Sequence, residues 1–318
     1  MTTDFPAAEL VDTGEIRMAV HETGSGPPVI LIHGFPELAF SWRHQLPALA
    51  NAGYRAIAPD MRGYGGTDKP QEVADYTIQK LIGDVTGLMD ALELERALIV
   101  GHDWGALVGW QMCLLAPERM AGYVALNIPF FKRPPLNPVT LMRLRFGKRF
   151  YIVNFQDSDE ADRRFAENPR HFIDALMRVR SVDRQSKTPK RGRRRPLSLL
   201  EMFDSEDPGG EPLLTDAELD YYADAFAAGG FTGPINWYRN ITRNWEISAD
   251  LPQRIDVPCA IIYGAYDIVP KGGDVSEYIP NLESITLECG HWIQQEKSDE
   301  VNAFLLDWLK RNTPARAA

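Results

Sequence analysis

An aspartate lies between two glycines in the segment Gly101-His-Asp-Trp-Gly105, which has the form G-x-nucleophile-x-G. An apolar run precedes this segment and helical spacing follows it, so we expect Asp103 at a sharp strand-to-helix turn. A carboxylic acid with a reference pKa of about 4 is ionised at neutral pH and needs no base to become nucleophilic. The alternative is that Asp103 only caps the helix, and the two flanking glycines argue against it.

An acid and a histidine follow this nucleophile in the chain order that such a turn predicts. Asp267 comes just after the apolar run 258–263, and His291 comes after the run 282–287. Sites in open α/β sheets form beyond the carboxyl ends of the strands, so these side chains are expected to meet. We predict that His291 acts as a general base and that Asp267 orients it.

A turn near the first clear apolar run offers hydrogen-bond donors for a developing negative charge. The sequence there reads His33-Gly-Phe-Pro-Glu37. The backbone N–H groups of Phe35 and Trp104 are the candidate donors of an oxyanion hole. A plain tight turn is the alternative for this segment taken alone.

Short apolar runs alternate with stretches of helical spacing through most of the chain. This alternation predicts a mostly parallel sheet covered by helices on both faces, an α/β class. Between about residues 130 and 245 we find helices and loops but no clear strand, so a helical insertion interrupts the α/β core. The expected strands are 28–33, 54–58, 97–100, 124–127, 258–263 and 282–287, and the expected helices of the core are 38–52, 78–92, 105–116 and 298–310.

Composition excludes several classes of protein. The chain of 318 residues carries a formal net charge of −10, so binding to nucleic-acid backbones is not expected. Its three cysteines form no C-x-x-C pair, which argues against a zinc knuckle or a redox dithiol. The N-terminal residues resemble no signal peptide, and no apolar run approaches the roughly 18 residues of a membrane span. We therefore expect a cytoplasmic protein without a membrane span.

One segment is strongly basic: residues 187–195 read Lys-Thr-Pro-Lys-Arg-Gly-Arg-Arg-Arg. Such a run can bind an anion, a membrane or a partner, or it can be a solvated loop. Proline and glycine interrupt it and no aromatic residue lies within it, which favours the solvated loop.

Together these motifs resemble those of the epoxide hydrolases of the α/β-hydrolase superfamily, in particular the soluble epoxide hydrolases. The resemblance covers nearly the whole chain and is carried by His33–Glu37, Asp60–Asp68, Gly101–Gly105, Asp267 and His291. It implies an α/β-hydrolase core made of residues 1–131 and 248–318. It also implies a helical cap, residues 132–247, inserted after the sixth strand.

Two tyrosines of the insertion match the family motifs that carry ring-opening phenols. Tyr151 begins the motif Tyr-Ile-Val-Asn-Phe-Gln, and Tyr238 lies within Asn236-Trp-Tyr-Arg-Asn240. A phenol with a pKa of about 10 can donate to the leaving oxygen without being ionised at pH 7. The resemblance thus implies an enzyme that opens an epoxide through a hydroxyalkyl ester on Asp103 and releases a vicinal diol.

The resemblance also implies what the enzyme binds. The partners are a small apolar epoxide and water, with no metal ion and no organic cofactor, and the chain is expected to be a monomer or a homodimer. Detoxification and the use of epoxides as a carbon source are both open as its cellular role. Aromatic residues near the motifs are candidates for an apolar substrate pocket: Phe35, Trp104, Phe130, Trp237 and Trp292.

Other activities are possible on the same scaffold. A haloalkane dehalogenase also uses an aspartate followed by tryptophan, but it binds halide through N–H donors rather than through phenols. A fluoroacetate dehalogenase usually has arginine after the aspartate, and an esterase has serine in its place. A non-catalytic binding protein is the alternative from another class, and the presence of Asp103, Asp267 and His291 together argues against it.

Overall fold

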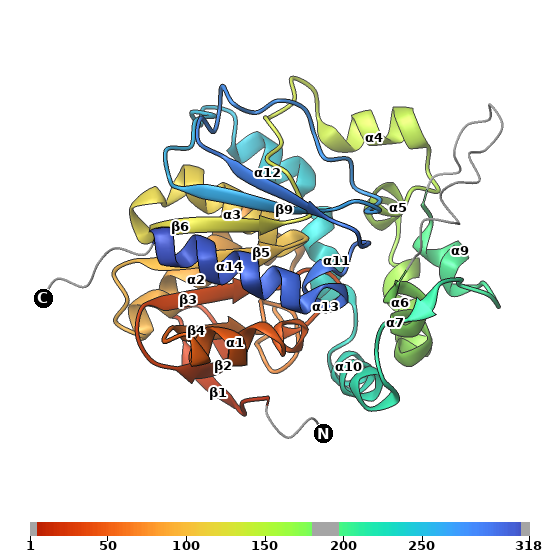
Figure 1. The fold of residues 1–318 in the computed structure, drawn as a ribbon. Coiled ribbons are helices and arrows are strands. Elements are labelled where there is room, and N and C mark those ends of the chain that lie inside the picture. Colours follow the sequence, from red (N-terminus) through yellow and green to blue (C-terminus); the bar gives the residue numbers. More distant parts are fainter. Residues whose placement is uncertain (1–4, 180–196, 313–318) are drawn as a thin grey trace, which may run out of the picture.

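The central feature of the computed structural model, which describes residues 5–179 and 197–312, is an eight-stranded sheet (Figure 1). Its strands lie in the order β1-β2-β4-β3-β5-β6-β9-β10, and all neighbours from β4 to β10 are parallel. The strand bounds are β1 Ala8–Asp12, β2 Arg17–Gly24, β3 Pro28–Ile32, β4 Arg55–Pro59, β5 Ala97–His102, β6 Met120–Leu126, β9 Cys259–Gly264 and β10 Glu283–Leu287. The predicted α/β class is confirmed. The basic run 187–195 lies outside the described residues.

Two parts of the core differ from the sequence-based prediction. The strands β1 and β2 were not predicted, because β1 is an exposed edge strand without an apolar run, and it pairs antiparallel with β2. The expected helix 38–52 is divided into a 3₁₀ turn, Ala39–Trp42, and helix α1, Gln45–Asn51. Proline lacks an N–H group and is tolerated only in the first turn of a helix, so α1 begins just before Pro47.

Helices cover both faces of the sheet, as Figure 1 shows. Helix α1 and the last helix, α14 (Ser298–Asn312), bury apolar side chains such as Leu46 and Trp308 against one face. Helices α2 (Ile78–Ala91) and α3 (Trp104–Leu115) pack on the other face. This arrangement leaves the strand ends and the loops that follow them free to carry functional side chains. Short helical turns complete the core: Val73–Tyr76, Pro117–Arg119 and α13, Ile293–Glu296.

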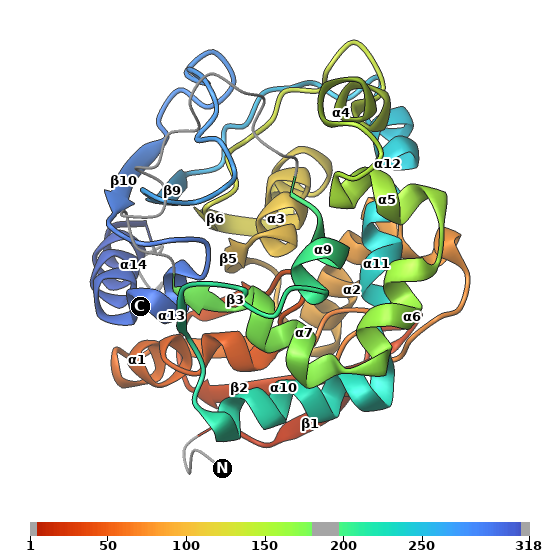
Figure 2. The same ribbon diagram turned by 90° about the vertical axis from the view of Figure 1, so that its right-hand side faces the viewer.

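A helical segment connects β6 to β9. Figures 1 and 2 show that most of it gathers beyond the strand ends that also carry α13. It contains one strand pair that was not predicted, β7 (Arg178–Val179) with β8 (Glu211–Pro212). The limits of a cap at residues 132 and 247 stay a prediction. The helices are α4 Pro138–Phe146, α5 Tyr151–Asp157, α6 Glu160–Glu167, α7 Pro169–Leu176, α9 Leu199–Phe203, α10 Asp216–Gly229, α11 Thr232–Arg239 and α12 Ile241–Ile247.

None of the helices formed by residues 5–179 and 197–312 is both long and apolar enough to cross a membrane.

Candidate active site

Asp103 occupies the turn between β5 and α3 and has a strained backbone, with φ of +51°. Glycines make this turn possible because the chain folds tightly on itself. A Cβ atom at Gly105 would collide with the carbonyl oxygen of Ile32, and one at Gly101 would collide with the carbonyl oxygen of Gly105. The strain is typical of a residue whose side chain is held in a functional position.

The loop after β3 approaches the Asp103 carboxylate from the core side. The Phe35 backbone N–H donates to Asp103 Oδ1 at 2.9 Å. Gly34 allows this approach, since a Cβ there would collide with the Asp103 side chain. The Trp104 backbone N–H belongs to the first residue of α3, directly after Asp103, and its role as the second donor stays a prediction.

His291 lies between two carboxylates that come from different loops. Its Nε2 is 3.6 Å from Asp103 Oδ2, and its Nδ1 is 3.0 Å from Asp267 Oδ1. Asp267 follows β9 and His291 follows β10, so the structure brings together the three residues that the sequence analysis selected.

The charges of this group support one another. Burial alone would lower the pKa of His291, but the Asp267 and Asp103 carboxylates raise it well above its usual value. Burial would likewise raise the pKa of Asp103, but attraction to His291, together with the Phe35 amide, lowers it overall. Both shifts favour an ion pair between the Asp103 carboxylate and a protonated His291.

The two selected tyrosines lie in the helical segment, close enough to Asp103 to be influenced by its charge. Tyr151 begins α5 and Tyr238 lies in α11, with their ring centroids 5.6 Å apart. Burial and the negative charge of Asp103 raise the pKa of Tyr151, and burial raises the pKa of Tyr238 with contributions from Tyr151 and Asp103. Both phenols thus keep their protons at neutral pH and can donate hydrogen bonds.

The candidate pocket aromatics fall into three places. The rings of Phe35 and Trp104 contact Tyr238, with centroids 5.3 and 5.0 Å away. Trp237 is fully buried and packs against Trp104, while Trp292 packs against His291. Phe130 instead packs against Trp110 and Tyr278. The assignment of all five to a substrate pocket stays a prediction.

A buried pair behind the site has no role in the sequence analysis. Glu37 and His102 have fully buried side chains, and Glu37 Oε2 lies 2.6 Å from His102 Nδ1. Glu37 Oε2 also accepts from the Gly34 N–H at 3.1 Å, and His102 Nε2 is 2.8 Å from the carbonyl oxygen of His291. The available signal was their position within the two motifs around Phe35 and Asp103.

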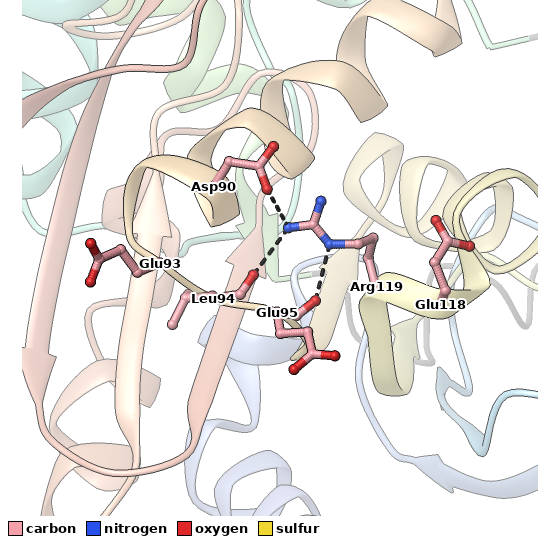
Figure 3. A pocket seen from close by; sticks show the side chains of 6 residues that line it. All are labelled: Asp90, Glu93, Leu94, Glu95, Glu118 and Arg119. Carbon is pink, nitrogen blue, oxygen red and sulfur yellow. Dashed lines mark hydrogen bonds and ion pairs between the residues drawn. The ribbon is translucent and has the colours of Figure 1, made fainter.

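A separate surface pocket of about 430 Å³ lies near the amino ends of β5 and β6 (Figure 3). Its lining is mostly acidic, and Arg119 there binds the Asp90 carboxylate and the carbonyl oxygens of Leu94 and Glu95. Such a lining suits no apolar substrate, and the pocket lies at the strand ends opposite to Asp103.

No group of three or more His, Cys, Asp or Glu suited to a metal ion occurs in the described part of the chain.

Comparison with protein families finds a match over most of the chain. The model of the alpha/beta hydrolase fold matches residues 27–298. Epoxide hydrolase A of Mycobacterium tuberculosis is 42% identical over 315 residues, covering 96% of this chain and 97% of its own. Epoxide hydrolase 3 of Siraitia grosvenorii is 37% identical and covers 95% of this chain and 97% of its own.

Comparison with solved structures also finds epoxide hydrolases. The crystal structure of epoxide hydrolase A from Mycobacterium thermoresistibile has a TM-score of 0.86 and 37% identity, and the match covers 96% of this chain and 98% of that one. Potato (Solanum tuberosum) epoxide hydrolase I has a TM-score of 0.84 and 33% identity, with 96% and 99% covered.

Proposed function

Because the chain belongs to the epoxide hydrolases of the α/β-hydrolase fold family, we propose that it converts an apolar epoxide and water to a vicinal diol through a covalent ester on Asp103. Asp103 is the nucleophile, His291 the base and Asp267 the residue that orients it. Tyr151 and Tyr238 are the proton donors. We propose further that residues 132–247 form the cap that holds these phenols over the nucleophile.

One observation carries this proposal: two phenols of the helical segment, one buried (Tyr238) and one half-buried (Tyr151), lie close enough to Asp103 for its charge to influence both. The Tyr238 ring contacts Phe35 and Trp104, the two neighbours of that carboxylate. Tyr151 lies against Tyr238, and the pKa of both is raised by burial first, with a contribution from the Asp103 charge. An epoxide between the phenols and the carboxylate would have its oxygen at donors and a ring carbon at the nucleophile.

In the first step Asp103 Oδ2 attacks a ring carbon, and the bond between that carbon and the epoxide oxygen breaks. Attack opposite to the breaking bond requires the donors and the nucleophile on opposite sides of the ring. The departing oxygen takes a proton from a phenol, so no free alkoxide forms. The tyrosinate recovers its proton from solvent, and nothing leaves the enzyme in this step.

In the second step water attacks Cγ of the ester, and His291 Nε2 accepts the proton of that water. The negative charge develops on Oδ1, which is the atom that the Phe35 N–H binds at 2.9 Å in the free enzyme. Asp267 balances the charge of the imidazolium. As this intermediate collapses, the His291 imidazolium gives its proton to the departing oxygen, which releases the diol. The Asp103 carboxyl group then loses the proton of its added hydroxyl to His291, which restores the carboxylate.

Loss of the charge on Asp103 prepares His291 for the second step. In the free enzyme both neighbouring carboxylates raise the pKa of His291. Ester formation removes the charge of one of them, so the pKa of His291 falls and its proton is released more readily. His291 is therefore first the protonated partner of the Asp103 carboxylate and afterwards the base that accepts a proton from water.

His291→Gln separates the two steps and tests the proposal. Asp103 needs no base to attack, so this variant should open styrene oxide but hydrolyse the ester slowly. Intact-protein mass spectrometry should show up to about one equivalent of an adduct with the full mass of the epoxide. A peptide digest should assign the adduct to the peptide with Asp103. A haloalkane dehalogenase would instead add the haloalkane minus hydrogen halide.

Wild-type protein, which should turn over the same epoxide, is the positive control. If His291→Gln stays unmodified while the wild type forms diol, the ester mechanism is wrong and Asp103 acts as a base for direct attack by water. If the wild type binds styrene oxide and other epoxides without turnover, the binding-protein alternative is correct.

A further inference from the structure

A buried arginine at the boundary between the core and the helical segment has no role in the reaction as described so far. Arg43 lies between the first 3₁₀ turn and α1, and its side chain is 7% exposed. Its Nε donates to Glu218 Oε1 at 2.5 Å, and the Glu218 side chain is 12% exposed. Glu218 belongs to α10, so this ion pair joins the core to the helical segment.

The same guanidinium also contacts the core beside the catalytic loop. Arg43 Nη1 donates to Gln295 Oε1 at 2.6 Å, and Gln295 Nε2 donates to Glu37 Oε1 at 3.1 Å. Gln295 belongs to α13, which begins two residues after His291. Arg43 is thus connected to Glu37 through a single side chain.

Glu37 continues the chain of contacts to both parts of the hydrolytic site. It binds the Gly34 N–H, next to the Phe35 donor, and His102 Nδ1. The other nitrogen of His102 lies 2.8 Å from the carbonyl oxygen of His291, to which the Asn127 side chain also donates. Every contact from Glu218 to the His291 backbone is therefore a hydrogen bond between buried or nearly buried groups.

This series of buried hydrogen bonds is costly in free energy if any member is lost. A buried charge is costly unless it is paired, and removal of one member leaves its neighbours without partners. Glu218 is doubly fixed, because it also forms a capping box with Thr215 at the start of α10. The position of α10 and the orientation of the Arg43 guanidinium are consequently linked.

We propose that Arg43, with Gln295 and Glu218, is a positioning residue for ester hydrolysis. Through it, the packing of α10 against the core is coupled to the positions of His291 and the Phe35 amide. Arg43 acts through Gln295 and Glu37 and does not touch the substrate. The tyrosine donors lie on α5 and α11 rather than on α10, so Arg43 should affect ring opening much less than hydrolysis. This inference rests on the proposed two-step function.

Single-turnover experiments with styrene oxide separate the two rates. Rapid quenching followed by intact-protein mass spectrometry gives ester formation and ester decay for each variant. Arg43→Met removes every donor while keeping much of the side-chain volume. We expect it to slow ester decay by about tenfold and to change ester formation by less than about twofold, because small displacements of catalytic groups have effects of this size. Arg43→Lys, which keeps the charge, should recover part of the loss.

The protein offers a matched control in another arginine that pairs with the same helix, α10. Arg170 of α7 pairs with Asp216 and Asp220 of α10, but these side chains are 47–94% exposed and lie outside the proposed coupling. Arg170→Met should leave both rates at the wild-type level, since exposed ion pairs contribute little. Glu218→Gln breaks the buried pair from its other end, so it tests the coupling even if Arg43→Met folds poorly.

The outcomes distinguish this inference from the function on which it rests. Slower ester decay in Glu218→Gln and Arg43→Met, with no further loss in the double variant, supports a single coupled chain. Wild-type ester decay in both variants overturns the positioning role while the ester mechanism stands. An equal fall of both rates together with a lower Tm overturns it as well, because that is the signature of general destabilisation. If the wild type forms no ester, the covalent mechanism and the positioning role both fail.

Discussion

The two sides of the Asp103 carboxylate are built in different ways. On the core side, the groups come from loops that follow the parallel strands β3, β9 and β10. A backbone amide and one nitrogen of His291 approach the carboxylate, and the other nitrogen of His291 contacts Asp267. In the helical segment, two phenols on short helices are held near this carboxylate by packing of aromatic rings, and we propose that they lie on its other side.

This difference matches the two steps of the proposed reaction. Hydrolysis of an ester requires a base, an oxyanion donor and a water molecule in fixed geometry, and strand ends provide rigid attachment. Ring opening requires only weak acids over an apolar space, which helices can hold above substrates of varied shape. The core side should therefore determine hydrolysis, and the helical side should determine ring opening and selectivity.

The largest effect is expected when the Asp103 carboxylate, which both sides share, is removed. Asp103→Ala should abolish diol formation, by at least about 10⁴-fold, because both steps take place on this carboxylate. The fold should persist, since the side chain sits at a turn and not in either apolar core. Diol release by chromatography, with circular dichroism as the folding control, measures this. Near wild-type turnover in a folded variant would refute the mechanism.

The next effect tests the helical side alone. Tyr151→Phe/Tyr238→Phe keeps both rings and removes both acids, so ring opening should fall by about 10³-fold, within the range of general acid catalysis. Each single variant should lose less, because one phenol still donates. The rate of ester formation is the measured quantity. An unchanged rate in the double variant would show that the phenols are not the donors.

The pH dependence should differ between the two sides. The pKa of Asp103 is lowered below the usual value of a carboxyl group, so this group should leave ester formation nearly constant from about pH 5 to pH 9. Hydrolysis needs neutral His291. In the ester only the Asp267 carboxylate still raises the pKa of this residue, and the rate should rise with pH by about tenfold per unit below that pKa. The fraction of enzyme present as ester at steady state should therefore fall as the pH rises. A fraction that grows with pH would contradict the assignment of His291 as the base.

The smallest effect is expected from a change in how closely α11 packs against the core. A Cβ atom at Gly233 would lie 2.9 Å from the Cα of Gly63 and 2.9 Å from the hydroxyl oxygen of Tyr76. Gly233→Ala should therefore displace α11 and Tyr238 slightly and slow ester formation by about three- to tenfold, with a smaller change in hydrolysis. Rapid quenching gives both rates.

Gly83→Ala is the matched control for this variant. Gly83 also lies in a helix, α2, and a Cβ there would meet nothing within 4 Å. This substitution should leave both rates unchanged and stabilise the protein by about 0.5–1 kcal/mol through helix propensity, which thermal unfolding measures. If Gly233→Ala behaves like Gly83→Ala, the contact with Gly63 does not position Tyr238.

The sequence-based predictions were most accurate where the signal lies within a few neighbouring residues. The turn at Asp103 and the order Asp103, Asp267, His291 depend on short motifs after apolar runs, and the structure brings these residues together. The edge strand β1 was missed, because its side chains are largely exposed and show no apolar run. The division of the expected helix 38–52 was missed as well, although Pro47 was visible.

The sequence by itself determined the α/β class and the short motifs in which the candidate catalytic residues lie, because turns with glycine and runs of apolar residues act over a few neighbouring positions. Only the tertiary structure decided which distant groups surround them. Arg43 and Glu218 are 175 positions apart, and Glu37 and Gln295 are 258 apart. No local pattern encodes such pairs, since their contact depends on how α10 and α13 pack against the core, and each residue alone resembles any other polar residue of the chain.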